Sequence, residues 1–344
     1  MSRSPLLSLT DPAPRAARLG RAIEDGLDLP SDGRIAVLRP RGFEDFDPLP
    51  RDRLHMIQGF RPDHDALAAA GFAVATTPEG RYAAAVVCLP RAKAQARGLL
   101  AQAAALTDGP VLVDGQKDDG VESVLRDLRA RVPVAGVVSR AHGKLFWYDP
   151  RGDRLSDWAV RPQPMDDPLA PGFVTLPGVF SADGVDPGSR LLAGALPPSL
   201  GARVADLGAG WGFLAAQALQ RPGVQEMHLI EAEHDALACA RSNITDSRAQ
   251  FHWADATAFA LPQPVHTVLC NPPFHTGRTA RPELGRAFIG TAARLLTPKG
   301  TLWLVANRHL PYDRTLAESF RSVEEVAETP SFRVWCATAP KKSR

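Results

Sequence analysis

The most distinctive chemistry in the chain belongs to the Asn-Pro-Pro-Phe motif at residues 271–274, directly after an apolar run. The Asn271 side-chain carbonyl and the Pro272 main-chain carbonyl can accept both hydrogens of a planar amine and hold its nitrogen in line with a reacting atom. Proline fixes φ near about −65°, so Pro273 stiffens the loop. Phe274 can stack on a flat base for about 1–3 kcal/mol. The candidate catalytic residues are therefore Asn271, Pro272, Pro273 and Phe274.

The chemistry of base amines explains this choice of residues. An exocyclic amine is a poor nucleophile because its lone pair is delocalised into the ring, so acceptors must draw it toward tetrahedral geometry. No strong general base is needed, since the proton becomes acidic only as the new bond to nitrogen forms. Asn-Pro-Pro can also simply end a strand. Its position at a strand end, 16 residues after Asp255, favours the functional interpretation.

A glycine-rich turn at residues 208–212, Gly-Ala-Gly-Trp-Gly, follows an apolar run that is expected to be a strand. Because glycine has no Cβ, Gly208 and Gly210 let a ligand approach the backbone of a tight strand-to-helix turn. A dinucleotide fingerprint would place a third glycine at position 213. Phe213 stands there, which argues against a nicotinamide cofactor.

Three acids end successive expected strands: Asp206, then Glu231 25 residues later, then Asp255 24 residues after that. The carboxyl ends of parallel strands face one crevice, so the acids are expected to converge on a ligand. A single acid after a strand is often only a helix N-cap. Three of them beside a glycine turn favour a ligand site. The candidate cofactor-binding residues are Asp206, Gly208, Gly210, Glu231, Asp255, Ala256 and Asn271.

Short β-branched runs alternate with alanine- and leucine-rich stretches from about Arg34 onward. This pattern predicts an α/β fold with a parallel sheet covered by helices on both faces. The 344 residues, 44% of them hydrophobic, suffice for two domains with separate cores, joined by a Pro- and Gly-rich linker at 148–178. Strands are expected at 35–38, 84–89, 111–114, 134–138, 204–207, 227–230, 250–253, 265–270, 301–306 and 332–338.

The two halves of the chain echo each other, which predicts two tandem Rossmann-like domains, 1–165 and 166–344. The first copy has Arg39-Pro40-Arg41 in place of the glycine turn and Leu89 in place of Asn271. It is therefore expected to be a degenerate copy without a cofactor site, kept for substrate binding or for stability. The matching segments are 33–38 with 202–207 and 87–90 with 269–272.

Bulk composition limits the possible partners. Lys+Arg 40 against Asp+Glu 38 gives a formal net charge of +2, which excludes a polycationic binder, so any nucleic-acid contact must come from a local patch. The cysteines show no C-x-x-C spacing or clustered histidines, so no metal is expected. The start lacks a signal peptide's apolar stretch, and no run of roughly 20 apolar residues follows. A soluble cytoplasmic protein without membrane contact is expected. The cysteines are Cys88, Cys239, Cys270 and Cys336.

The glycine turn and the three acids resemble the class I S-adenosylmethionine methyltransferases, and Asn-Pro-Pro-aromatic resembles the signature of the amino-methyltransferases. With residues 177–189 and 305–312, the motif is similar to the ribosomal RNA guanine-N2 methyltransferases. The small-subunit methyltransferase C group is the most similar, and the large-subunit methyltransferase G group is its sister. The resemblance implies S-adenosylmethionine as cofactor, an inactive N-terminal copy of the methyltransferase fold, and methyl transfer to a guanine 2-amino group of ribosomal RNA, foremost 16S rRNA.

The resemblance also implies roles for the acids. Glu231 would accept the ribose hydroxyls, Asp255 the adenine amino hydrogen, and Asp206 would lie near the cationic methionine end. The chain departs from the family pattern at Trp211 and at Glu231, where aspartate is common. Glutamate keeps the acceptor role, so cofactor binding is not put in doubt.

A guanine amine inside a helix is paired and hidden, so the substrate base must be unpaired or extruded. Phe180 and Ser181 are expected to cover the cofactor, with a core-packing Phe180 as the alternative. Phosphate contacts, or else solvated surface charges or helix ion pairs, are expected at His275, Arg278, Arg281, Arg286, Arg308 and His309, and more weakly at Arg91, Lys93, Arg140, Lys144, Lys341, Lys342 and Arg344.

Four alternatives stay open. The target could be a guanine of 23S rRNA, or an adenine N6, against which only the flanking segments argue. A protein glutamine-N5 methyltransferase uses the same motif, but usually with Tyr after the prolines and a helical N-terminal domain. This chain has Phe274 and an α/β first half. A non-catalytic RNA-binding module is disfavoured by the intact acids and Asn271.

Overall fold

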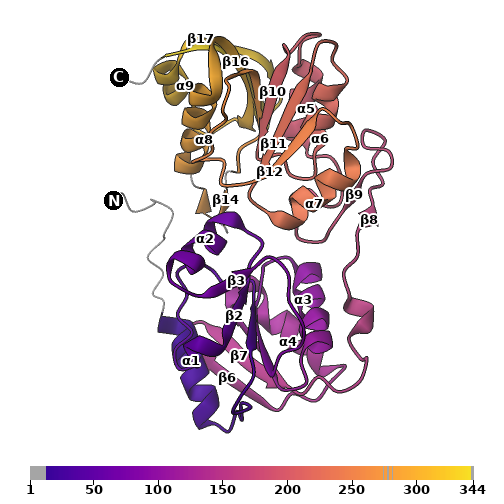
Figure 1. The fold of residues 1–344 in the computed structure, drawn as a ribbon, viewed down its shortest axis with the longest axis vertical. Coiled ribbons are helices and arrows are strands. Elements are labelled where there is room, and N and C mark those ends of the chain that lie inside the picture. The colour runs from indigo at the N-terminus through magenta and orange to yellow at the C-terminus, as the bar shows by residue number, and fades with distance from the viewer. Residues whose placement is uncertain (1–12, 274, 277–278, 281, 342–344) are drawn as a thin grey trace. The chain divides into compact units, whose positions relative to one another are not determined.

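The structure is a computed structural model that describes residues 13–273, 275–276, 279–280 and 282–341. It divides the chain into two compact units, Met1–Arg161 and Pro162–Arg344 (Figure 1). The boundary falls inside the Pro- and Gly-rich segment 148–178. Each unit holds one seven-stranded sheet with helices on both faces, so the predicted α/β fold of two Rossmann-like domains is confirmed.

The N-terminal sheet has the strand order β3-β2-β1-β4-β5-β7-β6, and β7 runs antiparallel to both of its neighbours. Helices α1 and α2 pack on one face, and α3 and α4 on the other. The strands are β1 (Ile35–Leu38), β2 (Leu54–Ile57), β3 (Ala73–Ala75), β4 (Ala84–Cys88), β5 (Val111–Gln116), β6 (Gly136–Arg140) and β7 (Gly143–Tyr148). The helices are α1 (Ala13–Glu24), α2 (Arg61–Ala69), α3 (Lys93–Leu106) and α4 (Val121–Arg129), with short 3-10 turns η1 (Arg51–Arg53), η2 (Lys117–Asp119) and η3 (Ser156–Trp158).

The C-terminal sheet has the order β12-β11-β10-β13-β16-β18-β17, and β18 is antiparallel to both neighbours. Helices α5 to α7 cover one face, and α8 and α9 the other. The strands are β10 (Arg203–Leu207), β11 (Glu226–Glu231), β12 (Ala249–Trp253), β13 (Val265–Cys270), β16 (Leu296–Asn307), β17 (Phe320–Glu328) and β18 (Phe332–Pro340), with two short pairs, β8 (Gln163–Pro164) with β9 (Val174–Thr175) and β14 (His275–Thr276) with β15 (Thr279–Ala280). The helices are α5 (Pro187–Ala195), α6 (Phe213–Leu219), α7 (His234–Asn243), α8 (Pro282–Leu295) and α9 (Asp313–Ser319).

The two sheets have the same topology, and single hydrogen bonds repeat between them. The Arg39 N–H donates to the carbonyl at the end of β2 at 2.8 Å, as the Gly208 N–H donates to the carbonyl at the end of β11 at 2.9 Å. Both residues lie in the left-handed region, with φ of +60° at Arg39 and +78° at Gly208. An arginine therefore holds, at a conformational cost, a turn geometry that glycine adopts freely.

The strand register corrects one detail of the predicted repeat. Leu38 pairs with Val87 across β1 and β4, and Leu207 pairs with Cys270 across β10 and β13. The residue equivalent to Asn271 is therefore Cys88, not Leu89. The sequence alignment slipped by one position because Leu-Cys-Asn-Pro and Val-Cys-Leu-Pro match best on their cysteines. The conclusion that the first copy lacks the amide is unchanged.

Candidate functional site

A cleft lies at the carboxyl ends of β10 and β13 in the C-terminal unit, where a parallel sheet presents its ligand site. It encloses about 380 Å³ of empty space, including the part open to solvent. Three of the predicted site residues, Gly208, Gly210 and Asn271, line it directly. The full lining is Phe180, Ser181, Asp186, Ser189, Gly208, Ala209, Gly210, Trp211, Phe213, Leu214 and Asn271.

The glycine turn forms the floor of this cleft. Gly210 has a φ of +56°, and a Cβ built on it would meet no atom within 4 Å, so the position faces open space. Gly212 has a φ of +97°, and its Cβ would lie 2.8 Å from Ile244, so close packing also requires glycine there. The turn therefore leaves room for a ligand at Gly210 and packs tightly at Gly212.

Glu231 ends β11 beside the turn and is tied to it. Its Oε2 accepts a hydrogen bond from the Gly210 amide and its Oε1 accepts one from the Glu233 amide, both at 2.8 Å. Burial raises the pKa of Glu231, and these two amides oppose the shift. Each carboxylate oxygen has a second lone pair, so the fixed carboxylate can also accept bonds from ligand hydroxyls.

Asp206 lies within β10 and is only 1% exposed. Neither of its oxygens has a hydrogen-bond partner among the described residues. Burial and the neighbouring Glu231 carboxylate raise its pKa to about 8, while the Ala215 amide, which falls short of hydrogen-bond geometry, opposes them. A buried carboxyl without a partner is costly, and a cationic ligand group close by would offset that cost.

Asp255 and Ala256 do not line the cleft. Asp255 Oδ1 accepts hydrogen bonds from the Thr257 amide at 2.8 Å and the Thr257 hydroxyl at 2.7 Å, while Ala256 is buried. This local bonding stabilises a turn, whereas the alternative weighed for these acids was a helix N-cap. Contact of Asp255 with a ligand stays a prediction.

The Asn271 side chain is held by two neighbours that sequence reasoning did not assign to the site. Its Nδ2 donates to Asp186 Oδ2 and to Ser189 Oγ, both at 2.8 Å. Asp186 Oδ2 also accepts the Ser189 backbone N–H at 2.7 Å and so caps the N-terminus of α5. With its NH2 group bound on this side, the amide carbonyl of Asn271 is left for other partners at the cleft.

The rest of the predicted catalytic loop is described only in part. Pro272 is buried and Pro273 is exposed. Phe274 lies outside the described residues, as do Arg278, Arg281, Lys342 and Arg344. His275 begins strand β14, and its side chain is not described.

Phe180 is on the surface of the cleft and not in the core, so the core-packing alternative is wrong. Its side chain is 58% exposed, the largest exposure among the described large apolar residues. The Trp211 indole N–H donates to its carbonyl at 3.1 Å, and Ser181 next to it has a φ of +53°. Trp211 itself is buried. The segment is therefore pinned by its backbone while the aromatic ring is free to contact a ligand.

Several of the predicted phosphate-binding residues form ion pairs. Arg308 pairs with Glu328 at 2.8 Å, Lys93 with Asp127 at 2.8 Å, and Lys144 with Glu122 at 3.3 Å. Lys341 donates to the Ala317 carbonyl at 2.6 Å. For Arg308, Lys93 and Lys144 the structure supports surface ion pairing. Arg91, Arg140, Arg286 and His309 are exposed.

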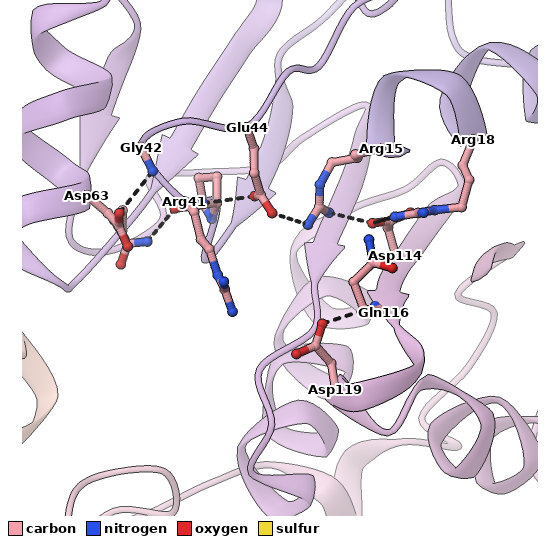
Figure 2. Close-up of polar contacts among 11 residues, drawn as sticks. Arg15, Arg18, Arg41, Gly42, Glu44, Asp63, Asp114, Gln116 and Asp119 are labelled. Atoms are coloured by element: carbon pink, nitrogen blue, oxygen red, sulfur yellow. Dashed lines mark hydrogen bonds and ion pairs between the residues drawn. The ribbon is translucent and has the colours of Figure 1, made fainter. Parts of the chain in front are cut away.

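In the N-terminal unit, two arginines of helix α1 bind carboxylates (Figure 2). Arg18 of α1 binds Asp114 of β5 through two hydrogen bonds of 2.6 and 2.9 Å, and both side chains are buried. Arg15 lies 2.7 Å from Glu44 and 3.0 Å from Asp114. Helix α1 precedes β1 as α5 precedes β10, so these ion pairs stand where α5 holds Asn271.

Comparison with known proteins fits this site. Residues 171–336 match the family model of the methyltransferase small domain, so the C-terminal unit is a domain of this family. The unit thus has the fold of a methyltransferase domain, and its site fits S-adenosylmethionine. The buried Asp206 carboxyl, the open space at Gly210 and the fixed acceptors of Glu231 suit the cationic end and the ribose of that cofactor.

The relatives are ribosomal RNA methyltransferases. Ribosomal RNA large subunit methyltransferase G of Pseudomonas syringae pv. tomato is 37% identical over 209 residues, which are 58% of this chain and 55% of the relative. Ribosomal RNA small subunit methyltransferase C of Alteromonas mediterranea is 29% identical over 261 residues, 74% of this chain and 72% of the relative. The chain spans about half the length of the large-subunit relatives it matches, 43% and 55% in two of them.

One solved structure shares the fold over both units. It is a T. thermophilus 16S rRNA N2 methyltransferase in complex with AdoMet and guanosine, with a TM-score of 0.76 and 24% identity, and the match covers 96% of this chain and 92% of that one. No helix in the described part of this chain is long and apolar enough to cross a membrane. Among the described residues, no cluster of His, Cys, Asp or Glu could hold a metal ion.

Proposed function

We propose that this protein transfers a methyl group from S-adenosylmethionine to the exocyclic 2-amino group of a guanine in small-subunit ribosomal RNA. The observation that carries the proposal is the orientation of Asn271. Its NH2 group is bound by Asp186 and Ser189, which leaves the carbonyl oxygen as an acceptor at a methyltransferase cleft. A guanine amine needs such an acceptor.

The residues that would hold the cofactor come from three strand ends. Glu231 would accept the ribose hydroxyls, and Asp206 would face the cationic methionine end. The turn at Gly208 and Gly210 allows close approach to backbone, and Asp255 with Ala256 would complete the adenine side. Bound S-adenosylmethionine supplies an electrophilic methyl group.

The substrate amine would be held by the catalytic loop. The Asn271 Oδ1 and the Pro272 carbonyl would accept its two hydrogens and draw the nitrogen lone pair out of the ring plane. Orientation of this kind lowers the barrier without a strong base, because the amine proton becomes acidic only as the N–C bond forms. Pro273 would keep the loop rigid.

A base must leave its helix to reach these acceptors. Phe180 offers an exposed aromatic face at the cleft for stacking, and Phe274 is expected to add a second one. Base stacking contributes about 1–3 kcal/mol per base, enough to offset much of the cost of unstacking. The N-terminal unit would add substrate binding or stability. With ribosomal RNA as substrate, the reaction would take place in the cytoplasm.

Two comparisons support a guanine of small-subunit ribosomal RNA as the target. The solved neighbour of the same fold is a 16S rRNA N2 methyltransferase. The small-subunit methyltransferase C relatives are matched over 72% to 77% of their length, against 42% to 55% for the large-subunit relatives. A guanine of 23S rRNA is the second candidate, because the large-subunit relatives reach the higher identity, 41%.

The test is incubation of the protein with labelled S-adenosylmethionine and unmodified small- and large-subunit RNA or particles, followed by mapping of the labelled nucleotide. The proposal expects N2-methylguanine in small-subunit RNA. Label in 23S rRNA selects the second candidate. Label at adenine N6, in a protein glutamine, or nowhere contradicts the proposal.

A further inference from the structure

The Asn271 amide can do its proposed work only with one of its two ends in the cleft. Rotation by half a turn would exchange the carbonyl and the NH2 group at almost no steric cost, because the two ends are nearly the same size. The NH2 end would present hydrogens to an amine that also carries hydrogens. Some feature of the fold must therefore select one orientation.

We infer that Asp186 is the positioning residue that makes this selection. An ionised carboxylate only accepts hydrogen bonds, so its Oδ2 can bind the NH2 end of Asn271 and rejects the carbonyl end. The contact is 2.8 Å, in the range of charge-assisted hydrogen bonds, which are the stronger kind. Ser189 Oγ adds a second contact of 2.8 Å, but a hydroxyl can also donate and so selects less strictly.

Asp186 is itself held in place by the fold. The same Oδ2 accepts the Ser189 backbone N–H at 2.7 Å and caps α5, with Pro187 at the first helical position. Helix α5 is anchored in the core through Leu192, which is fully buried. One carboxylate oxygen thus joins a rigid helix end to the catalytic amide, 85 residues apart in sequence.

The N-terminal copy lacks this arrangement. Cys88 stands in place of Asn271, and Arg15 and Arg18 of the preceding helix bind Asp114 and Glu44. Where there is no amide to orient, the helix before the first strand makes ion pairs. The helix before the first strand therefore orients an amide only in the copy that carries the proposed catalytic residue.

The test uses three variants of the full chain, and its catalytic part rests on the proposed function. In Asp186→Ser the shorter hydroxyl still caps α5 but withdraws the acceptor from Asn271, so kcat should fall about 10- to 100-fold. The KM for small-subunit particles and the Kd for S-adenosylmethionine should stay within a few-fold. Asp186→Asn keeps an acceptor oxygen, which the Ser189 backbone N–H would hold toward Asn271, and it should rescue kcat to near wild type. Arg190→Ala removes an α5 side chain that is 55% exposed and pairs with Asp167 at 3.3 Å, and it should leave kcat unchanged.

A second readout needs no RNA. With 15N-asparagine labelling, the Asn271 NH2 signal is identified by its loss in Asn271→Ala. It should show slowed hydrogen exchange in wild type and in Asp186→Asn, and fast exchange in Asp186→Ser. If the RNA assay fails for the wild type while this pattern holds, the proposed function falls and the positioning role stands.

Three results overturn the inference. One is a wild-type kcat, or an unchanged Asn271 signal, in Asp186→Ser. Another is a large rise in the Kd for S-adenosylmethionine with kcat unchanged, which would make Asp186 a cofactor ligand instead. The third is a fall in the melting temperature of Asp186→Ser matched by Asp186→Asn, which would reduce its role to the helix cap.

Discussion

Glu231 accepts a 2.8 Å hydrogen bond from the Gly210 amide, so the second strand end and the glycine turn form one rigid unit. In the N-terminal copy the equivalent residue is Gln58, whose Oε1 accepts the Phe60 amide as Glu231 accepts that of Glu233. The Gln58 amide nitrogen donates to the Pro40 carbonyl instead. Glu231 therefore accepts a hydrogen bond from the turn in the C-terminal unit, whereas Gln58 donates one to the turn in the N-terminal unit. This difference distinguishes the ligand site of the C-terminal unit from the closed turn of the N-terminal unit.

Replacing Glu231 should therefore weaken binding of the cofactor. Glu231→Gln keeps the size of the side chain but gives it the donor of Gln58, and we expect the Kd for S-adenosylmethionine to rise about 10-fold or more, since hydrogen bonds to charged groups contribute about 1.5–3 kcal/mol. Titration calorimetry measures this. Glu226→Gln, on the same strand but 46% exposed at its side chain, is the matched control and should bind normally. Equal affinity of the two variants would contradict the role of Glu231.

Asp206 should make cofactor binding depend on pH. Its carboxyl has a pKa of about 8 in the free protein, and a nearby sulfonium or ammonium would favour the ionised form. Affinity should therefore rise with pH and level off above about 8, with release of a proton on binding. The α-amino group of the cofactor titrates near about 8 too, so the quantity to compare is the difference between wild type and Asp206→Asn. A pH-independent difference refutes the assignment.

The same carboxyl should lower the stability of the fold at neutral pH. Its pKa is about 8 when folded against the ordinary 3.8, so the folded state binds the extra proton between these values. Stability from this group is present at low pH and is lost as pH rises through about 8. Asp206→Asn should unfold at higher denaturant concentration than wild type at pH 8, with little difference near pH 4. A variant less stable at pH 8 would show that Asp206 has structural partners.

Phe180 is exposed at the cleft, so we predict that it matters for the substrate and not, as the resemblance implied, for covering the cofactor. We expect Phe180→Ala to lower kcat/KM for RNA about 10-fold, the loss of one stacked base, with cofactor Kd unchanged and with Phe180→Trp close to wild type. Leu169→Ala removes another exposed apolar side chain of the same unit, outside the cleft, and serves as control. If both alanine variants behave alike in steady-state kinetics, Phe180 has no substrate role.

The buried ion pairs of the N-terminal unit should be essential for its stability. Arg18→Ala leaves Asp114 buried beside Arg15 alone, and loss of one partner of a buried pair costs about 3–5 kcal/mol. Arg21→Ala removes an exposed pair with Asp25 on the same helix and should cost about 0–1 kcal/mol. Denaturant unfolding measures both. Equal effects would mean that Asp114 is satisfied without Arg18.

The central strands of both sheets could be predicted from sequence because both of their faces are buried. The bounds expected for 35–38 and 265–270 are those of β1 and β13. Strand β17 was not predicted, since it is an edge strand with mostly exposed residues and several glutamates. Strands β2, β3 and β7 were not predicted either. The turn before β7 is Ala141-His142 with φ of +50° and +57°, where Asn-Gly is the usual signal.

The residues of the site also fall into those that the sequence predicts and those that it does not. Gly210, Glu231 and Asn271 could be found because each stands at a strand end, where topology alone brings residues together. The contact of Asp186 with Asn271 spans 85 residues and depends on how α5 packs, which no local pattern encodes. The only local signal was an Asp-Pro helix start, which predicts a cap and says nothing of a partner.

The measurement that tests the account most directly is methyl transfer by Asn271→Ala. Wild type and variant are incubated with labelled S-adenosylmethionine and unmodified small-subunit particles, and the labelled nucleotide is mapped. We predict that the variant binds the cofactor within a few-fold of wild type and transfers no methyl to guanine N2. Retained transfer to guanine at the wild-type rate would contradict the role of the Asn271 carbonyl.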